Sequence, residues 1–109
     1  QEILVLAMFD SKSMLIGEKV ISVGTSNAAL ISPREIYRTA LQEQAVYIVI
    51  LHNHPSGNPE PSREDVQVTR KIKQSGEILD ILLMDHIIIG DNRYFSFREQ
   101  DILFEKGRE

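Results

Sequence analysis

Cysteine is absent from the 109-residue chain. A chain without thiols cannot form a disulfide scaffold, a thiolate zinc finger or a cysteine nucleophile, so these three classes are excluded. The absence also fits a reducing compartment, and we expect a cytoplasmic protein.

Long apolar runs are missing too. No segment reaches the roughly 18 uninterrupted apolar residues of a membrane-spanning helix, so we expect no membrane association. Residues 1–6 lack a basic region, and we therefore expect no secretory signal peptide. The chain also lacks an initiator methionine and begins directly on a strand-like run. We infer from this that the sequence is a piece of a longer protein.

Charge of one sign is not concentrated anywhere. The chain has 12 basic and 16 acidic residues, a formal net charge of -4. Nonspecific binding to phosphate backbones needs a clustered positive surface, so the composition argues against that function. Alternatively, the mild acidity only confers solubility. The length predicts one domain, residues 1–109, and the 42% of hydrophobic residues are enough for its own core.

The first half of the chain reads as two strands, a helix and a strand. Ser32, Pro33 and Glu35 predict a helix start, because serine can cap, proline suits the first position, and glutamate completes a capping box. The run AVYIVIL at 45–51 is rich in β-branched residues and predicts a strand with both faces buried. The elements expected here are strands over 2–9 and 14–23, a helix from 32 to about 43, and the strand 45–51.

The second half begins with a loop, residues 52–61, that contains three prolines. Ser62, with Asp65 three residues later, predicts a second capped helix, and Gly76 marks its expected end. Residues 78–89 predict one or two strands, followed by a turn and a hairpin strand over 94–97. Residues 101–106 are either a short helix or a frayed tail.

The order β-β-α-β-α-β-β predicts an α/β fold in which helices flank a central mixed sheet. Open α/β sheets bind ligands beyond the carboxyl ends of their strands. The loop that follows the buried run 45–51 lies at such a place, so its residues are the first candidates for a functional site.

Two histidines follow that run directly. Side chains two residues apart in extended chain point to the same face, so His52 and His54 project together. Two imidazoles can share a metal ion at about 2.0–2.1 Å each. Asp65, in the first turn of the next helix, can bring a carboxylate to the same point. These three ligands leave a fourth position open, which is typical of catalytic rather than structural zinc.

Each of these residues also has a purely structural interpretation. Two close histidines can be core residues or loop residues without a shared role, and Ser62 with Asp65 can be only a capping box. The joint spacing is what favours a metal site. The native metal stays open, because imidazole and carboxylate accept several divalent ions.

The spacing His-x-His, seven residues, Ser, two residues, Asp resembles the motif of the JAMM (MPN-type) metallopeptidases. The chain matches it at His52, His54, Ser62 and Asp65. The wider text HNHPSGNPEPSRED, with SPREIYRTAL before it and LLMDHIIIGDNRYFSF after it, is similar to the RadC branch over nearly the whole chain.

The resemblance implies a JAMM-type, cytidine-deaminase-like fold in the C-terminal part of a longer RadC-like protein. It also implies one zinc ion held by His52, His54 and Asp65, with water as the fourth ligand. Ser62 would help to stabilise an oxyanion. The implied reaction is hydrolysis of a peptide or isopeptide bond in a peptide or protein substrate, and RadC-like proteins carry a DNA-repair label.

The family also needs an upstream glutamate as general base. Glu18, in the second expected strand, is the best match. We do not select Glu2, which lies near the terminus, or Glu35 and Glu43, which belong to the first expected helix. The alternative is that Glu18 is only a solvent-facing residue.

The remaining polar candidates have structural explanations. His86 is expected to be a neutral core histidine, with a role in orienting the metal ligands as the alternative. Asn53 is expected to point away from the metal. Arg34 and Arg38 are one helical turn apart, as on a solvated helix face.

Other functions compete with the hydrolase. A noncatalytic, metal-stabilised module could serve as a platform for protein or DNA complexes, with DNA contacted only through regions absent from this chain. The letters HNH suggest a nuclease, but nucleases of that name spread the three residues over a long ββα segment. A zinc nucleobase deaminase needs a His-x-Glu motif and two cysteines, which this chain lacks. The oligomeric state is left open.

Overall fold

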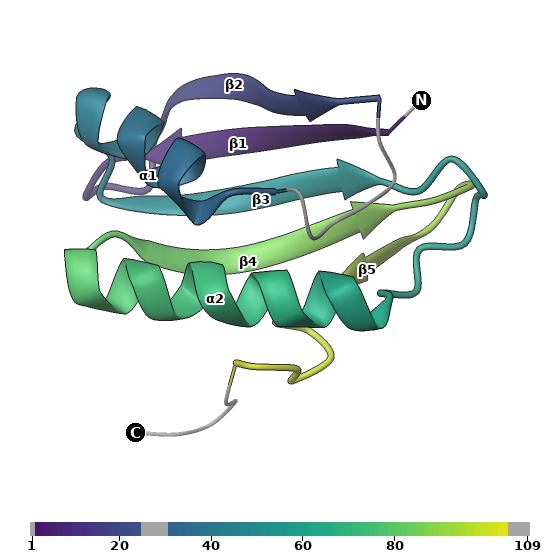
Figure 1. The fold of residues 1–109 in the computed structure, drawn as a ribbon. Helices are drawn as coiled ribbons and strands as arrows, with labels where there is room; N and C mark the ends of the chain where they lie inside the picture. Colours follow the sequence, from purple (N-terminus) through teal and green to yellow (C-terminus); the bar gives the residue numbers. More distant parts are fainter. Residues whose placement is uncertain (1, 25–30, 105–109) are drawn as a thin grey trace.

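The structure is a computed structural model that describes residues 2–24 and 31–104. Figure 1 shows the strands side by side in a single sheet. The mixed α/β fold expected from the sequence is confirmed. The elements are, in chain order, β1 (Ile3–Phe9), β2 (Leu15–Val23), α1 (Pro33–Gln42), β3 (Tyr47–Asn53), α2 (Arg63–Leu79), β4 (Leu82–Ile89) and β5 (Tyr94–Ser96).

The sheet has five strands among the described residues, in the order β2-β1-β3-β4-β5. β3 and β4 run parallel, whereas the other neighbouring pairs run antiparallel. A parallel pair needs a crossover connection, and α2 provides it. The sheet is therefore mixed, with β3 at its centre.

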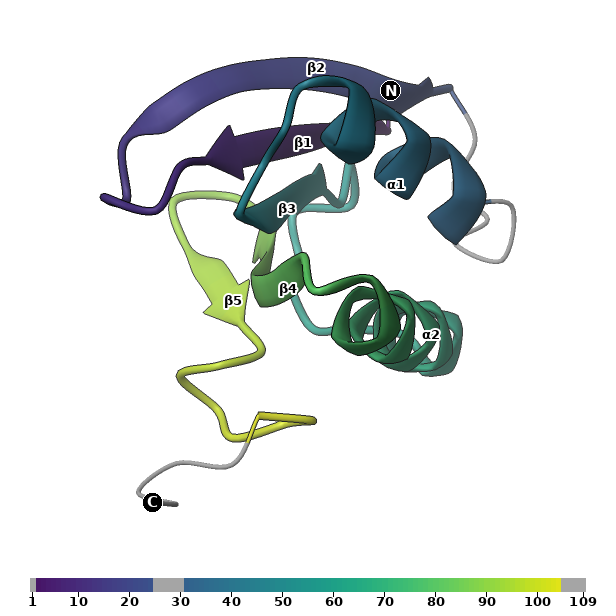
Figure 2. The ribbon, with the colours of Figure 1, turned by 90° about the vertical axis from the view of Figure 1, so that its left-hand side faces the viewer.

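Both helices lie on the same face of the sheet, as the turned view in Figure 2 shows. The connections β2–α1–β3 and β3–α2–β4 advance across the sheet in the same direction. Since crossovers between parallel strands are right-handed, two that advance in one direction place their helices on one face. The sequence predicted helices that flank the sheet, and in the described residues both helices cover the same face.

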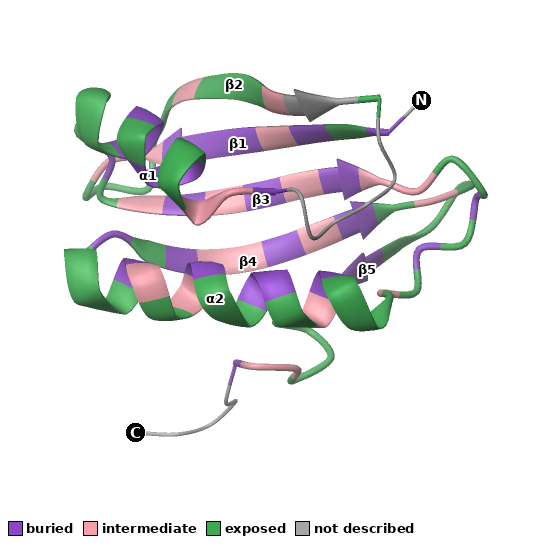
Figure 3. Cartoon of the chain, viewed as in Figure 1, coloured by how far each residue is buried: buried purple, intermediate pink, exposed green. Residues whose placement is uncertain are grey.

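The hydrophobic core lies between the sheet and the helices (Figure 3). On β3, Ile48 and Ile50 are fully buried, whereas Val49 and Leu51 are only half-buried. The prediction that both faces of this strand are buried is wrong, because no helix in the described parts covers the second face. Other core residues are Leu4, Leu6, Met8, Ile36, Ala40, Val68, Ile72, Leu83 and Ile88.

The two helix starts differ from each other. At α2 the capping box is complete: the Ser62 hydroxyl accepts from the Asp65 N–H, and the Asp65 carboxylate accepts from the Ser62 N–H. At α1, Ser32 makes no side-chain cap hydrogen bond. The predicted capping box of Ser32 and Glu35 is therefore wrong, because the Glu35 carboxylate instead forms an ion pair with Arg38 at 2.6 Å.

The predicted end of α2 at Gly76 is also wrong, since the helix continues to Leu79. Asp80 ends it in the left-handed conformation, with φ of 59°. Gly76 has a packing role instead. A Cβ atom there would lie 2.3 Å from the Tyr37 hydroxyl and 2.4 Å from the carbonyl oxygen of Ile81. The glycine lets α1 and the chain after α2 approach the helix closely.

Other boundaries shift by a few residues. Residues 78–79, expected in a strand, belong to α2, and residues 52–53, expected in a loop, belong to β3. β5 ends at Ser96 rather than at residue 97. Residues 101–104 form no regular helix, and residues 105–106 lie outside the described ranges. No helix in the described ranges has the length and apolar character needed to cross a bilayer.

Candidate metal centre

The last residues of β3 carry the two histidines. His52 pairs with Leu4 of β1 and points to the helix-covered face, where it is buried. The His54 N–H still donates to the Ile89 carbonyl of β4, 2.9 Å away, so the chain stays extended beside β4. Because of this extended geometry the two imidazoles share one side, with ring centroids 5.0 Å apart.

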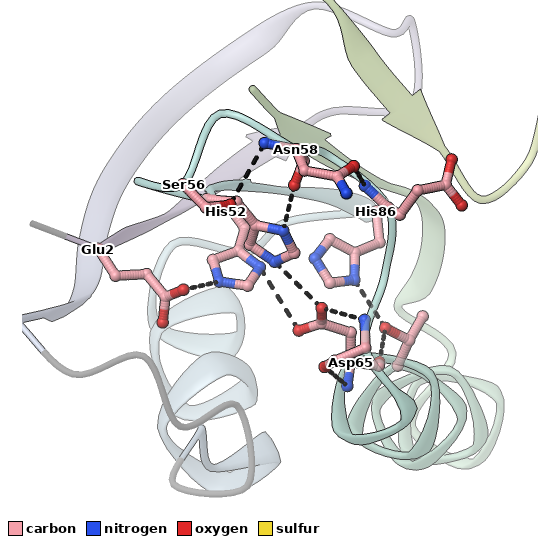
Figure 4. A network of polar contacts seen from close by, with 10 residues as sticks. Glu2, His52, Ser56, Asn58, Asp65 and His86 are labelled. Atoms are coloured by element: carbon pink, nitrogen blue, oxygen red, sulfur yellow. Dashed lines mark hydrogen bonds and ion pairs between the residues drawn. The ribbon is translucent and has the colours of Figure 1, made fainter. Parts of the chain in front are cut away.

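Asp65 comes to the histidines from the first turn of α2. Its Oδ2 lies 3.1 Å from His54 Nε2, and its Oδ1 lies 3.8 Å from His52 Nδ1. The capping box holds the carboxylate in place, since the Ser62 N–H donates to Asp65 Oδ2 at 2.8 Å. Asp65 and His52 are both buried. The structure therefore brings together the three residues that the sequence singled out as ligands. Figure 4 shows two of them, His52 and Asp65, facing each other.

The tautomer of His54 follows from its other contact. Its Nδ1 lies 2.9 Å from the carbonyl oxygen of Asn58, which can only accept, so Nδ1 carries the hydrogen. In the neutral ring Nε2 then has a free lone pair, the form that binds metals. This lone pair faces the Asp65 carboxylate. Two electron-rich groups at that distance need a cation or a proton between them.

The loop after β3 is held so that Asn58 can make this contact. Gly57 has φ of 90°, a conformation that favours glycine. Its N–H donates to the His54 carbonyl, and its carbonyl accepts from the Asp91 N–H, both at 2.9 Å. A Cβ atom on Gly57 would lie 2.5 Å from the Asp91 carboxylate. The loop therefore packs closely on the turn between β4 and β5.

A second carboxylate, Glu2, lies on the other side of His52. Its Oε2 is 3.2 Å from His52 Nε2, and its side chain is largely buried (Figure 4). Ligand atoms of Glu2, His52 and His54 all lie within 4.8 Å of one another. The site therefore offers carboxylates on two sides of a histidine pair.

The structure does not bring Glu18 to this site. Glu18 lies on the edge strand β2, is exposed, and pairs with Ala7 of β1. Ala7 is three residues from Leu4, the partner of His52, so Glu18 and His52 are on opposite faces of the sheet. The carboxylate that lies beside the candidate metal site is therefore that of Glu2 and not that of Glu18.

Sequence reasoning passed over Glu2 because of its position near the terminus. A signal was present, because Glu2 alternates with Leu4 and Leu6 and so continues the buried face of β1 by one position before the strand begins. Its meaning depended on the pairing of β1 with β3, which places Leu4 opposite His52. That pairing is a long-range contact that the local sequence pattern does not specify.

The donor set fits a divalent cation. Neither ring nitrogen of the buried His52 makes a well-aligned hydrogen bond to the described residues, although a carboxylate lies near each of them. Buried nitrogens of this kind are rare unless they bind an ion or water. Imidazole nitrogens with carboxylate oxygens are the ligands of catalytic zinc and of several other divalent ions.

His86 of β4 lies behind the site, with its ring centroid 5.6 Å from that of His52. The Thr69 hydroxyl donates to the Asp65 carbonyl at 2.6 Å and so accepts from His86 Nδ1–H, also at 2.6 Å. Burial, reinforced by His52, lowers the pKa of His86 from 6.5 to about 3, so the ring is neutral at neutral pH. It stacks on Phe97 as a core residue.

A cavity of about 340 Å³ opens beside the histidines. It is lined by Glu2, His54, Pro55, Ser56, Ser62 and Asp65. The two arginines of α1 are not part of it, because both are exposed and Arg38 pairs with Glu35. A substrate in this cavity would meet both carboxylates and the Ser62 hydroxyl.

Comparison with known proteins agrees with this fold. The sequence profile described as RadC-like JAB domain matches residues 1–102. The chain belongs to the RadC-like JAB domain family. In the described part of this JAB domain, Glu2, His52 and His54 form a group whose ligand atoms lie close enough together to hold a metal ion.

Curated relatives of this JAB domain carry the name UPF0758 protein. One from Clostridium perfringens is 48% identical over 103 residues, which cover 94% of this chain and 45% of the relative. Relatives from Thermotoga maritima and Methanococcoides burtonii are both 47% identical over 100 residues, 92% of this chain and 45% and 44% of their own length. The chain thus spans less than half of the relatives that it matches.

Proposed function

We propose that this JAB domain is a metal-dependent hydrolase that cleaves a peptide or isopeptide bond, with zinc as its ion. The observation that carries the proposal is the meeting of His52, His54 and Asp65 with the Glu2 carboxylate, 3.2 Å from His52 Nε2. Three protein ligands leave a coordination position open, as catalytic zinc sites do.

In this proposal His52, His54 and Asp65 hold the ion. When bound, it supplies a Lewis acid and lowers the pKa of a coordinated water toward about 7. Glu2 takes a proton from the attacking water as its oxygen bonds to the carbonyl carbon. Glu2 then delivers that proton to the leaving nitrogen as the C–N bond breaks.

Ser62 has a second task in the proposal. Its oxygen accepts from the Asp65 N–H at 3.0 Å, which leaves the hydroxyl hydrogen available, and Ser62 lines the cavity. A donor at that place would stabilise the negative oxygen of the tetrahedral intermediate. The capping role and the catalytic role are compatible, because one uses the oxygen and the other the hydrogen.

The test is turnover of fluorogenic peptide and isopeptide libraries by the zinc-loaded chain, with Glu2→Gln and its matched control Glu18→Gln. We expect Glu2→Gln to lower the rate by about 10²- to 10⁴-fold while zinc content is unchanged. Glu18→Gln should keep the wild-type rate, because Glu18 is exposed on the opposite face of the sheet.

Two outcomes would redirect the proposal. If Glu2→Gln loses the zinc, Glu2 is a ligand, as its place in the Glu2, His52 and His54 group allows. If the wild type binds zinc but cleaves nothing in either library, the domain is a metal-stabilised platform for protein or DNA complexes. Zinc-dependent cleavage of plasmid DNA would favour a nuclease instead.

A further inference from the structure

The placement of Glu2 depends on how the start of β1 is held. The peptide unit that joins Glu2 to Ile3 is fixed on both edges. Its carbonyl oxygen accepts from the Gly24 N–H, at the end of β2, at 2.8 Å. Its N–H donates to the side-chain oxygen Oδ1 of Asn53, at the end of β3, at 2.5 Å.

Two hydrogen bonds in opposite directions fix the orientation of this peptide plane, and with it the direction of the Glu2 side chain. Glu2 then points to the same face as Leu4, which pairs with His52. We call these two hydrogen bonds the clamp. On the β2 side the clamp uses the backbone of Gly24, whose φ of 99° favours glycine. The β3 side uses a side chain.

Asn53 makes this contact where backbone pairing between the two strands ends. The last paired residues of β1 and β3 are Leu4 and His52, so Ile3 and Asn53 would come next. The carboxamide oxygen of Asn53 satisfies the Ile3 N–H at this position. It does so from the face opposite the histidines, beside an apolar cavity of about 290 Å³ lined in part by Val5 and Leu51.

We propose that Asn53 is a positioning residue that fixes the Glu2 carboxylate beside His52 without touching the metal site. The inference rests on the proposed role of Glu2. An asparagine between the two histidines then has a physical reason. The Asn53 side chain binds the neighbouring strand β1, while the side chains of His52 and His54 face the candidate metal site. Without the hydrogen bond from Ile3 to Asn53, the start of β1 would be less constrained. The Glu2 carboxylate could then move away from His52.

The test compares Asn53→Leu, which keeps the size but removes the acceptor, with Asn53→Asp, which keeps an acceptor oxygen. Asn53→Ala is the second variant in case the leucine perturbs folding. We expect Asn53→Leu to lower kcat by about 10- to 100-fold, with KM and zinc content unchanged, because small displacements of a catalytic group cost that much. Asn53→Asp should restore most of the rate. In a Glu2→Gln background, Asn53→Leu should have no further effect.

A structural readout separates this inference from the proposed function. In crystal structures of the variants, Glu2 should move away from His52 in Asn53→Leu and Asn53→Ala but stay beside it in Asn53→Asp. If Glu2 stays beside His52 without the asparagine oxygen, the positioning role is rejected whatever the activity. If Glu2 moves away but the wild type cleaves no substrate, the hydrolase proposal fails while the clamp stands.

Discussion

Glu2 Oε2 and His52 Nε2 lie 3.2 Å apart, although one residue precedes the first strand and the other is near the end of the third. The antiparallel register of β1 and β3 creates this proximity, because it pairs Leu4 with His52. Continued alternation along both strands brings Glu2 and His54 to the same face. A carboxylate therefore reaches the histidine pair from a different element than Asp65 does.

Removal of one histidine should abolish metal binding. His54→Ala takes away the Nε2 lone pair that faces Asp65, and two remaining ligands hold an ion poorly. We expect zinc content, measured by elemental analysis of purified protein, to fall from about one equivalent to near zero. Glu18→Gln serves as the control and should keep its zinc. An unchanged content in His54→Ala would reject the site.

The two serines that precede the helices should differ in their effect on stability. Ser62→Ala removes a side-chain cap bond and should lower the free energy of unfolding by about 1 kcal/mol. Ser32→Ala should leave it nearly unchanged, because Ser32 makes no side-chain cap bond. Urea unfolding of both variants measures the difference. Equal losses in the free energy of unfolding would mean that both serines cap their helices to the same extent in solution.

Gly76→Ala should destabilise the fold despite the higher helix propensity of alanine. Its Cβ would lie 2.3 Å from the Tyr37 hydroxyl, so either that tyrosine or the chain around Ile81 must shift. We expect a net loss of about 1–3 kcal/mol in the free energy of unfolding. Gln74→Ala, at a position of the same helix away from this close approach, is the control and should be neutral or slightly stabilising. A stabilised Gly76→Ala variant would contradict the close approach.

Acid should destabilise the metal-free protein through His86. Its pKa is lowered to about 3 in the folded state, against 6.5 for an ordinary histidine, so the unfolded chain binds the proton first as pH falls. Stability is therefore complete above pH 6.5 and declines below it, by about 2 kcal/mol between pH 7 and pH 5 for this one group. Unfolding in chelator at both pH values measures the decline. His86→Asn should reduce the decline by that amount, and an equal slope in the variant would contradict it.

The local sequence determined most of the elements and three of the residues that meet at the candidate site. His52, His54 and Asp65 were identified because strand alternation and a capped helix start act over a few residues. The capping box at Ser62 and Asp65 is present for the same reason. Boundaries were less well predicted where tertiary packing intervenes, as at Gly76, whose missing side chain makes room for Tyr37.

Only the tertiary structure decided whether Glu2 or Glu18 lies beside the two histidines. Glu2 comes directly before the first strand, and Glu18 lies on the second. The local sequence pattern does not say which of the two is on the helix-covered face, where His52 lies. The strand order β2-β1-β3 and the register Leu4–His52 do say so. They depend on contacts between residues far apart in the chain, whereas alternation and capping are set by neighbours in sequence. The same long-range pairing gives Asn53 a partner on β1, which its own surroundings in the sequence do not reveal.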